Sequence, residues 1–285
     1  METTASDLVK DISGLVTLPD VYMRISQLLD NPNSGAGDIA KAIGRDPAFT
    51  LRLLKVANSA LYRFPSAVGT VAKAVSVIGT LQIRNLALSM SVAKSFAGLP
   101  NDLISMENFW KHSLYCALIA RYLAREARRC DPDALFTAGL LHDIGELVIF
   151  NRRPDAAREA LQTVLDSDNE MQVFEAERQA LGFDHCAVGG ELARQWHLPP
   201  LLEECIACHH DIASAEHHPR EVAIIHIANI VGQMAEVDSI DPADAAAINP
   251  LAWIVTGLAA DCIEPAIRAA QTELEEVEQL FTDKA

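Results

Sequence analysis

The sequence is short of aromatic residues and contains no long apolar run. Phe, Trp and Tyr make up 6% of its 285 residues, and the 14 glycines and 13 prolines are scattered along the chain as breaks. This composition disfavours a β-sandwich or barrel and favours helices. Because a membrane-spanning helix needs about 18 or more consecutive apolar residues, we expect no membrane segment.

The sequence also lacks an export signal. Its first residues, METTASDLVKDISG, have neither the basic start nor the apolar centre of a signal peptide. We therefore expect a cytoplasmic protein. Cysteines stay reduced in that compartment, and we expect these to be unpaired and mostly to pack as small apolar residues: Cys116, Cys130, Cys186, Cys205, Cys208 and Cys262.

Basic residues are in the minority. The chain has 23 Lys and Arg against 39 Asp and Glu, which gives a formal net charge of −16. Phosphate backbones repel so acidic a chain, and we do not expect nucleic-acid binding. The segment 38–59 still resembles a helix-turn-helix. A nucleic-acid-associated regulator therefore stays open as a third interpretation, with four basic residues as its contacts: Arg45, Arg52, Lys55 and Arg63.

Half of the residues are apolar, and along most of the chain they recur at helical spacing. Breaks such as NPNSGAG (32–38) separate the helical stretches. We expect the acidic tail to dock on the body of the protein or on a second copy of the chain. The sequence predicts an all-α fold with helices over 5–16, 20–30, 38–44, 47–59, 70–78, 81–97, 108–129, 131–150, 154–166, 170–181, 185–197, 200–210, 220–235 and 264–281.

One polar pair interrupts the apolar stretch DPDALFTAGLLHDIGELVIF (131–150). Asp131-Pro132 is typical of a helix start, since Asp can cap free N–H groups and Pro needs none. His142 and Asp143 follow among apolar neighbours, where an unpaired charge is costly. An imidazole beside a carboxylate is a metal ligand set. A pair that only forms hydrogen bonds within a helical core is an equal alternative.

Further histidines fall on helix faces that we expect to point inward. A single such histidine is usually a core residue, but imidazoles from several helices around one carboxylate form a metal site. Mostly imidazole ligands suit iron, manganese or zinc. With His142 and Asp143, the predicted ligands are His112, His185, His209 and His210.

The segment CIACH (205–209) matches the C-x-x-C-H pattern of covalent haem attachment. That attachment normally needs export, and the segment has the pattern of a regular helix after Pro199-Pro200, so we do not expect haem. Cys205, one turn before His209, is instead a candidate soft secondary ligand of the metal. Cys208 is expected to pack.

Two motifs, DPAFTLRLLKVANSALY (46–62) and AVSVIGTLQIRNLAL (74–88), are followed by GLLHDIGEL (139–147) and the pair His209-His210. In this order the sequence resembles the HDOD family, the HD-related output domains of bacterial signalling proteins, over roughly 15–235. The resemblance implies an N-terminal helical subdomain (1–107) packed on an HD-like helical bundle (108–235), with C-terminal helices (236–285) as a cap.

The order of histidines is also similar to that of the HD phosphohydrolases, and most of all to the HD-GYP cyclic-dinucleotide phosphodiesterases. This second resemblance implies that Asp143 bridges two metal ions, which generate a hydroxide beside a phosphodiester. The implied ligands are His112 and His142 on one side of Asp143, and His185, His209 and His210 on the other.

The sequence departs from the HD-GYP pattern in three places. Glu146 stands where that branch has Lys, Asn229 stands where it has a late Asp ligand, and DIASAEHHPR (211–220) replaces the GYP loop. Each departure removes a metal ligand or a substrate contact. We therefore predict a non-catalytic signalling module with a partial metal site, whose partners are other signalling proteins, a nucleotide ligand or a second copy. The alternative is a metal-dependent phosphohydrolase of nucleotides or cyclic dinucleotides, with Asp143 as its catalytic residue.

Overall fold

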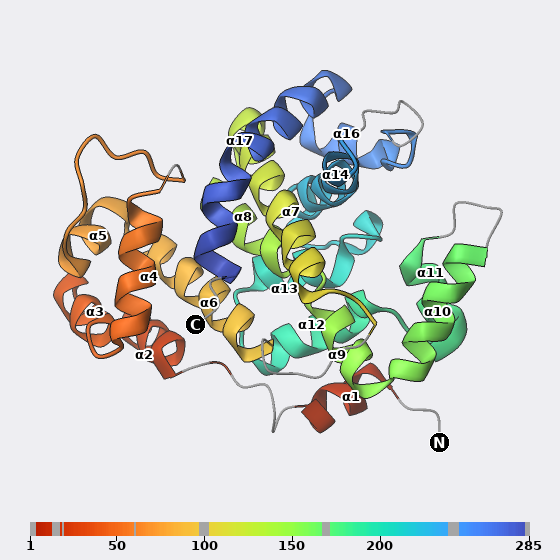
Figure 1. Ribbon diagram of the computed structural model, residues 1–285, viewed down its shortest axis with the longest axis horizontal. Helices are drawn as coiled ribbons and strands as arrows, with labels where there is room; N and C mark the ends of the chain where they lie inside the picture. Colours follow the sequence, from red (N-terminus) through yellow and green to blue (C-terminus); the bar gives the residue numbers. More distant parts are fainter. Residues whose placement is uncertain are drawn as a thin grey trace.

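The computed structural model describes residues 4–12, 18, 20–59, 61–96, 103–166, 172–238 and 245–282. Throughout these ranges the regular elements are helices and no strand occurs, which confirms the predicted all-α fold. An N-terminal bundle packs on an HD-like bundle, and the C-terminal helices cover the latter (Figure 1).

The N-terminal bundle consists of short capped helices that lie together at one end of the molecule (Figure 1). Asp46 accepts a hydrogen bond from Phe49 N at 2.9 Å and so caps α4, and Thr70 caps α5 in the same way. The last helix, α6, contacts α2 and α5 within the bundle and α8 beyond it. The helices are α2 (Asp20–Asp30), α3 (Ala36–Ile43), α4 (Pro47–Ala57), α5 (Val71–Ile78) and α6 (Thr80–Phe96).

The HD-like bundle is organised around α7 (Met106–Ala127), which runs through the middle of the molecule (Figure 1). Helices α8 and α14 pack along α7, while α12 packs against both α9 and α13. Helices α10 and α11 pack on each other at the edge. The elements are α8 (Pro132–Leu141), α9 (Ile144–Arg152), α10 (Pro154–Asp166), α11 (Val173–Leu181), α12 (His185–Gln195), α13 (Pro200–Cys208), η1 (Ile212–Ser214) and α14 (Pro219–Glu236).

The C-terminal helices complete the core. The short α16 (Pro250–Thr256) packs on α14, and the 3₁₀ turn η2 (Ala260–Cys262) leads into α17 (Ile263–Thr282). Helix α17 lies along α7, so the tail docks on the body of the protein, one of the two arrangements expected from the sequence. Its inward side is buried and apolar: Ala266, Ile267, Ala270, Leu274 and Val277.

Two of the predicted helices differ most from those observed. The stretch 131–150 is not one helix, because α8 ends at Leu141 and α9 begins at Ile144, which leaves His142 and Asp143 in a turn. The helix predicted over 5–16 is observed as α1 (Ala5–Ile12), and residues 13–17 lie outside the described part of the chain. Helix α1 packs against α9 and α12 of the HD-like bundle rather than joining the bundle of α2–α6.

The buried apolar side chains form one cluster that extends from α1 to α17. This continuity holds the elements that carry the polar residues of the HD-like bundle in fixed relative positions. In the described ranges, no single helix combines the length and the apolar composition that a membrane span requires.

Candidate metal centre

Imidazole rings surround the carboxylate of Asp143, a buried residue in the turn between α8 and α9. Each carboxylate oxygen faces two of them. The fifth ring, that of His210, lies with its centroid 4.3 Å from the ring of His209. The separations from Oδ2 are 2.9 Å for His142 Nε2 and 3.6 Å for His112 Nε2, and those from Oδ1 are 3.3 Å for His209 Nε2 and 3.5 Å for His185 Nε2.

The orientation of His142 is fixed from outside the cluster. Its Nδ1 lies 2.8 Å from the carbonyl oxygen of Gly139, one helical turn earlier. A carbonyl oxygen only accepts hydrogen bonds, so Nδ1 carries a proton and donates it. In the neutral ring, Nε2 then presents its lone pair to Asp143.

His209 and His185 repeat this arrangement. His209 Nδ1 lies 3.0 Å from the carbonyl oxygen of Ile206. His185 Nδ1 lies 2.7 Å from Oε2 of Glu177, a buried side chain that also accepts from the His185 backbone N–H at 2.8 Å. Donation of the outer N–H to a carbonyl or carboxylate is the usual arrangement of histidines that bind a metal through the other nitrogen.

The inner Nε2 atoms of these rings therefore meet at the centre of the cluster, where a metal ion can bind them. Among the described side chains, His142 Nε2, His185 Nε2 and Asp143 Oδ1 are buried without a hydrogen-bond partner. Each buried polar atom without a partner lowers the stability of the fold by about 1–3 kcal/mol. Ligands held tetrahedrally about 2.0–2.1 Å from a metal are about 3.3–3.4 Å apart, close to the distances of His209 and His185 from Asp143 Oδ1. The donor set therefore fits a metal ion.

Glycines let the helices approach closely enough to form the cluster. A Cβ on Gly145 would lie 2.0 Å from the carbonyl oxygen of His185, so α9 and α12 touch backbone to backbone. A Cβ on Gly139 would lie 2.8 Å from the backbone of Ala117, which sets α8 directly on α7. The first contact places Asp143 beside His185.

His112 differs from His142 and His185 because both of its nitrogens have hydrogen-bond partners. Nδ1 lies 2.6 Å from Oε1 of Glu236, and Nε2 lies 3.1 Å from Oδ1 of Asn229. Asn229 is buried on α14. The side-chain amide of Asn229, which stands where HD-GYP proteins have an Asp ligand, is thus hydrogen-bonded to His112 at the edge of the cluster.

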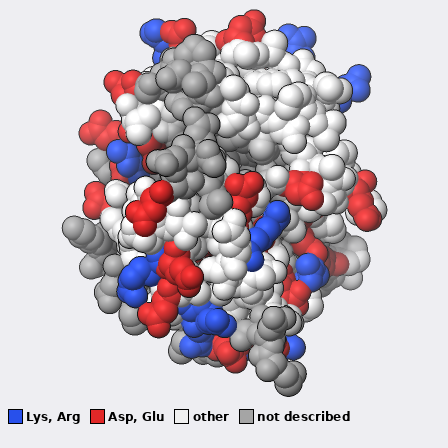
Figure 2. Space-filling view, turned by 90° about the vertical axis from the view of Figure 1, so that its right-hand side faces the viewer, with Lys and Arg blue, Asp and Glu red and all other residues white. Residues whose placement is uncertain are grey.

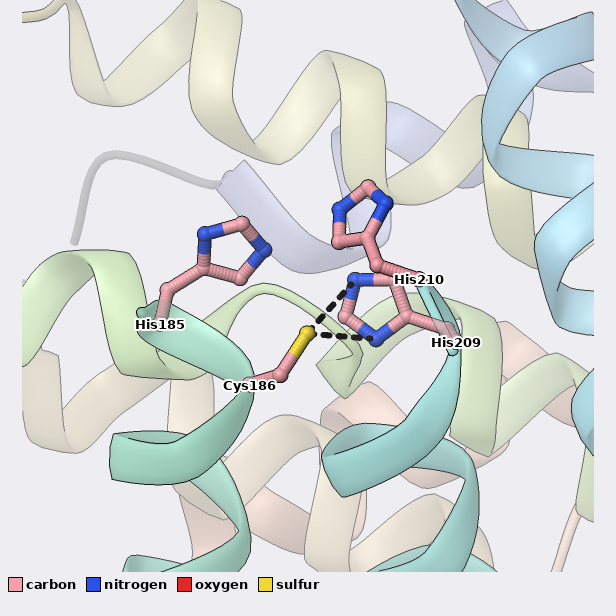
Figure 3. A group of neighbouring side chains, drawn as sticks. All are labelled: His185, Cys186, His209 and His210. Carbon is pink, nitrogen blue, oxygen red and sulfur yellow. Dashed lines mark hydrogen bonds between the residues drawn. The ribbon is translucent and has the colours of Figure 1, made fainter. Parts of the chain in front are cut away.

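Cys186 lies at the opposite end of the cluster, among three of the histidines (Figure 3). Its Sγ is 3.6 Å from each ring nitrogen of His209. One ligand atom from each of these four residues lies within 4.8 Å of the others: His185, Cys186, His209 and His210. The His210 ring also stacks on Phe174 of α11, with centroids 4.2 Å apart.

The close packing of these groups shifts several pKa values. Burial alone would lower the pKa of His142, but the Asp143 carboxylate outweighs it and holds that pKa well above its usual value. Burial would raise the pKa of Asp143, but the neighbouring imidazoles hold it well below normal. Burial beside Asp143 raises the pKa of Glu146 to about 8. Without a metal ion, His142 therefore carries a proton on Nε2 at neutral pH and pairs with the anionic Asp143, and a bound metal ion would replace that proton. Glu146 is mostly protonated.

All the residues predicted to form the site lie in this cluster: His112, His142, Asp143, His185, His209 and His210. That they bind a metal stays a prediction. Glu177 was not among the residues predicted to form the site. Glu177 is 1% exposed. It shares a helical stripe with Phe174 and Leu181, a spacing that indicates burial.

The cysteine in the cluster is not the one that the sequence predicted. Cys205 was the expected soft ligand, but the structure places Cys186 and not Cys205 among the imidazoles. Cys205 is fully buried elsewhere in the core, and burial raises its pKa well above the usual value. Position 205 precedes His209 by one turn, but α13 turns this side chain away from the cluster.

His226 of α14 has a structural role. Its Nδ1 donates to the carbonyl oxygen of His209 at 2.8 Å, and its Nε2 accepts from the backbone N–H of Asn249 at 3.0 Å. Both ring nitrogens are therefore satisfied by the protein. His226 fastens the turn that carries His209 to α14.

Comparisons with known proteins agree with this architecture. The family model of the HDOD domain matches residues 15–212. The chain is similar to an HDOD domain protein of unknown function from Geobacter sulfurreducens, with 23% identity over 98% of each chain and a TM-score of 0.76. A protein from Shewanella amazonensis SB2B, provisionally named a phosphohydrolase, matches with 25% identity over 98% of each chain and a TM-score of 0.75.

A third solved structure, provisionally named a signal transduction protein from Marinobacter aquaeolei VT8, has 19% identity and a TM-score of 0.70. The match covers 96% of this chain and 61% of that one, so it shows a shared fold within a longer protein. The search of curated proteins found no match.

Proposed function

We propose that this chain, which belongs to the HDOD domain family, is a non-catalytic signalling module built around a bound metal ion. The observation that carries this proposal is the set of inward Nε2 lone pairs of His142, His185 and His209 around Asp143. Their outer N–H groups are already donated to protein acceptors. We expect the module to act on other signalling proteins, in response to its metal or to a nucleotide, rather than to turn over a substrate.

The ligand set suits a transition metal. Asp143, His142, His185 and His209 would hold the ion, with His112 and His210 at the margins. Three imidazoles with one carboxylate fit iron, manganese or zinc. Such an ion supplies a positive charge that polarises bound ligands and cross-links the segments that hold it. Its ligands come from the α8–α9 turn, α12 and the end of α13, so metal loss would loosen three segments at once.

Burial supports a non-catalytic role. The side chains of His142 and His209 are fully buried, and that of Asp143 is 10% exposed. A phosphodiester would have to reach the metal through this closed surface. The protonated acid Glu146 stands in place of a cationic phosphate contact, and the carboxylate ligand expected at Asn229 is absent. A hydrolase would need the charges that these two positions lack.

One observation favours a metal-dependent phosphohydrolase as the second candidate. The two oxygens of Asp143 face different histidines, His142 and His112 on one side and His209 and His185 on the other. A carboxylate with ligands on both sides can bridge two ions, as in two-metal hydrolases. The Shewanella amazonensis protein of similar fold carries a phosphohydrolase name.

Elemental analysis of the purified full chain tests the metal centre. We expect a transition metal at near one equivalent, lost in His142→Ala and kept in His217→Ala, which removes an exposed imidazole outside the cluster. A metal-free protein that stays metal-free after incubation with iron, manganese and zinc would contradict the proposal.

Phosphodiesterase assays separate the two candidates. We expect no turnover of cyclic dinucleotides or of a generic phosphodiester by the protein supplied with manganese or iron. Turnover that disappears in Asp143→Asn, while metal content is still measurable, would establish the hydrolase instead.

A further inference from the structure

We propose that Cys186 is a sulfur ligand of the metal centre, so that the side of the site formed by α12 and α13 selects a thiophilic ion such as zinc. The inference rests on the proposed metal binding and adds a donor that the histidine and aspartate pattern of this chain does not include. It adds sulfur to the predicted oxygen and nitrogen ligands.

The position of the sulfur atom fits coordination. Zinc lies about 2.3 Å from a thiolate and about 2.0–2.1 Å from an imidazole nitrogen, so tetrahedral ligands of these two kinds lie about 3.6 Å apart. Cys186 Sγ is 3.6 Å from His209 Nε2. Figure 3 shows Cys186 and His185 leaving α12 side by side, with the rings of His209 and His210 facing them from the end of α13.

A second observation points to a cation at the same place. His185 Nε2 has no hydrogen-bond partner, and it cannot reach solvent because the residue is only 2% exposed. Because Glu177 accepts the Nδ1 proton of His185, Nε2 is the nitrogen left to bind a metal, and His185 belongs to the group that includes Cys186. A thiol offers this lone pair at most a weak hydrogen bond, whereas a shared metal ion satisfies both atoms.

The start of α12 holds the cysteine rigidly. Asp184 accepts from the backbone N–H of Ala187 at 2.9 Å, which caps the helix, and also accepts from Arg178 Nε at 2.7 Å. Cys186 therefore lies in the first turn of a capped helix, which fixes the position of its side chain. It is 4% exposed, so its partners are the residues of the cluster rather than solvent.

X-ray absorption spectroscopy of the zinc-loaded full chain tests the proposal. We expect a sulfur neighbour at about 2.3 Å beside nitrogen and oxygen neighbours at about 2.0–2.1 Å. In Cys186→Ser the sulfur shell should vanish. Zinc affinity should fall at least about tenfold, because loss of a mere hydrogen-bond partner of a ligand already costs about 10–100-fold. Cys205→Ser, which removes a buried thiol outside the cluster, should keep both the sulfur shell and the zinc affinity of the unaltered chain. Cobalt substitution gives a second readout, a sulfur-to-cobalt charge-transfer band that only Cys186→Ser removes.

The outcomes separate this inference from the proposed function. Zinc bound at one equivalent with only nitrogen and oxygen neighbours in the unaltered chain overturns the role of Cys186 and leaves the metal centre intact. A sulfur shell that survives in Cys186→Ser overturns it as well. Failure to bind zinc, cobalt, iron or manganese overturns both. Since the unaltered protein already decides the question, a variant that does not fold leaves the test valid.

Discussion

At the scale of single residues, the candidate site depends on hydrogen bonds made outside it. His185 keeps its inward lone pair because buried Glu177 accepts the Nδ1 proton. His142 and His209 use backbone carbonyls for the same purpose. Backbone acceptors cannot be removed by substitution, so Glu177 is the place where this outer layer can be tested by mutation.

Glu177→Gln should weaken metal binding without removing a ligand. The neutral amide is a poorer acceptor, so the His185 ring becomes less basic and less firmly oriented, and affinity should fall by about 10–100-fold. Glu175→Gln on the same helix is the control, since residue 175 is exposed and Gln preserves its capping interaction. Competition with a chromogenic chelator measures the metal affinity of both variants. Equal affinities of the two variants would contradict the assigned role of Glu177.

Gly145→Ala should destabilise the fold and disrupt the site. The added Cβ would lie 2.0 Å from the His185 carbonyl oxygen, so α9 and α12 must move apart. We expect a loss of at least about 1–3 kcal/mol in the free energy of unfolding, together with weaker metal binding. Gly37→Ala has open space around its Cβ and lies inside α3, so it should gain about 0.5–1 kcal/mol. Urea unfolding distinguishes the two, and similar midpoints would show that the close approach of α9 and α12 is unimportant.

At the scale of elements, the turn between α8 and α9 decides where the polar pair points. A continuous helix would set His142 and Asp143 about 100° apart around one axis. The break instead lets both side chains face the cluster, with Nε2 and Oδ2 2.9 Å apart. Helix α17 has a different role at this scale, since it covers the apolar side of α7 and supplies none of the candidate ligands.

Ile267→Ala should weaken the docking of α17 on α7. Ile267 is 4% exposed, and loss of its buried side chain leaves a cavity that costs about 2–5 kcal/mol. Glu275→Ala, on the exposed side of the same helix, should change the free energy of unfolding by less than about 0.5 kcal/mol. Thermal and chemical unfolding measure both effects. An unchanged Ile267→Ala variant would mean that α17 contributes little to the stability of the body.

At the scale of the whole molecule, the metal would join segments far apart in the sequence. A ligand that binds only the folded state at 100 times its dissociation constant stabilises that state by about 2.7 kcal/mol. We therefore expect chelation to lower the melting temperature and zinc to restore it. In His142→Ala the melting temperature should not respond to either treatment. A chelator-insensitive melting temperature in the metal-loaded wild-type protein would argue against a metal that holds the fold together.

The charge of the molecule argues against nucleic-acid binding. The formal net charge is −16, and on the face shown in Figure 2 the basic side chains stand among acidic ones rather than in a continuous patch. Arg63, one of the basic residues near the helix-turn-helix-like segment, pairs with Glu273 of α17 at 2.9 Å. We expect no shift of duplex DNA at moderate ionic strength. Binding that weakens steeply with salt would contradict this expectation.

The sequence by itself determined the helices, most of their ends and the list of histidines. These features are local, because apolar spacing sets the buried face of a helix and residues such as Asp46 and Asp184 cap its start. The tertiary structure alone decided that Glu177 and Cys186 belong to the cluster and that Cys205 does not. Their positions depend on how closely α9, α11, α12 and α13 pack, and that distance is set by contacts between residues far apart in the chain, such as Gly145 against His185.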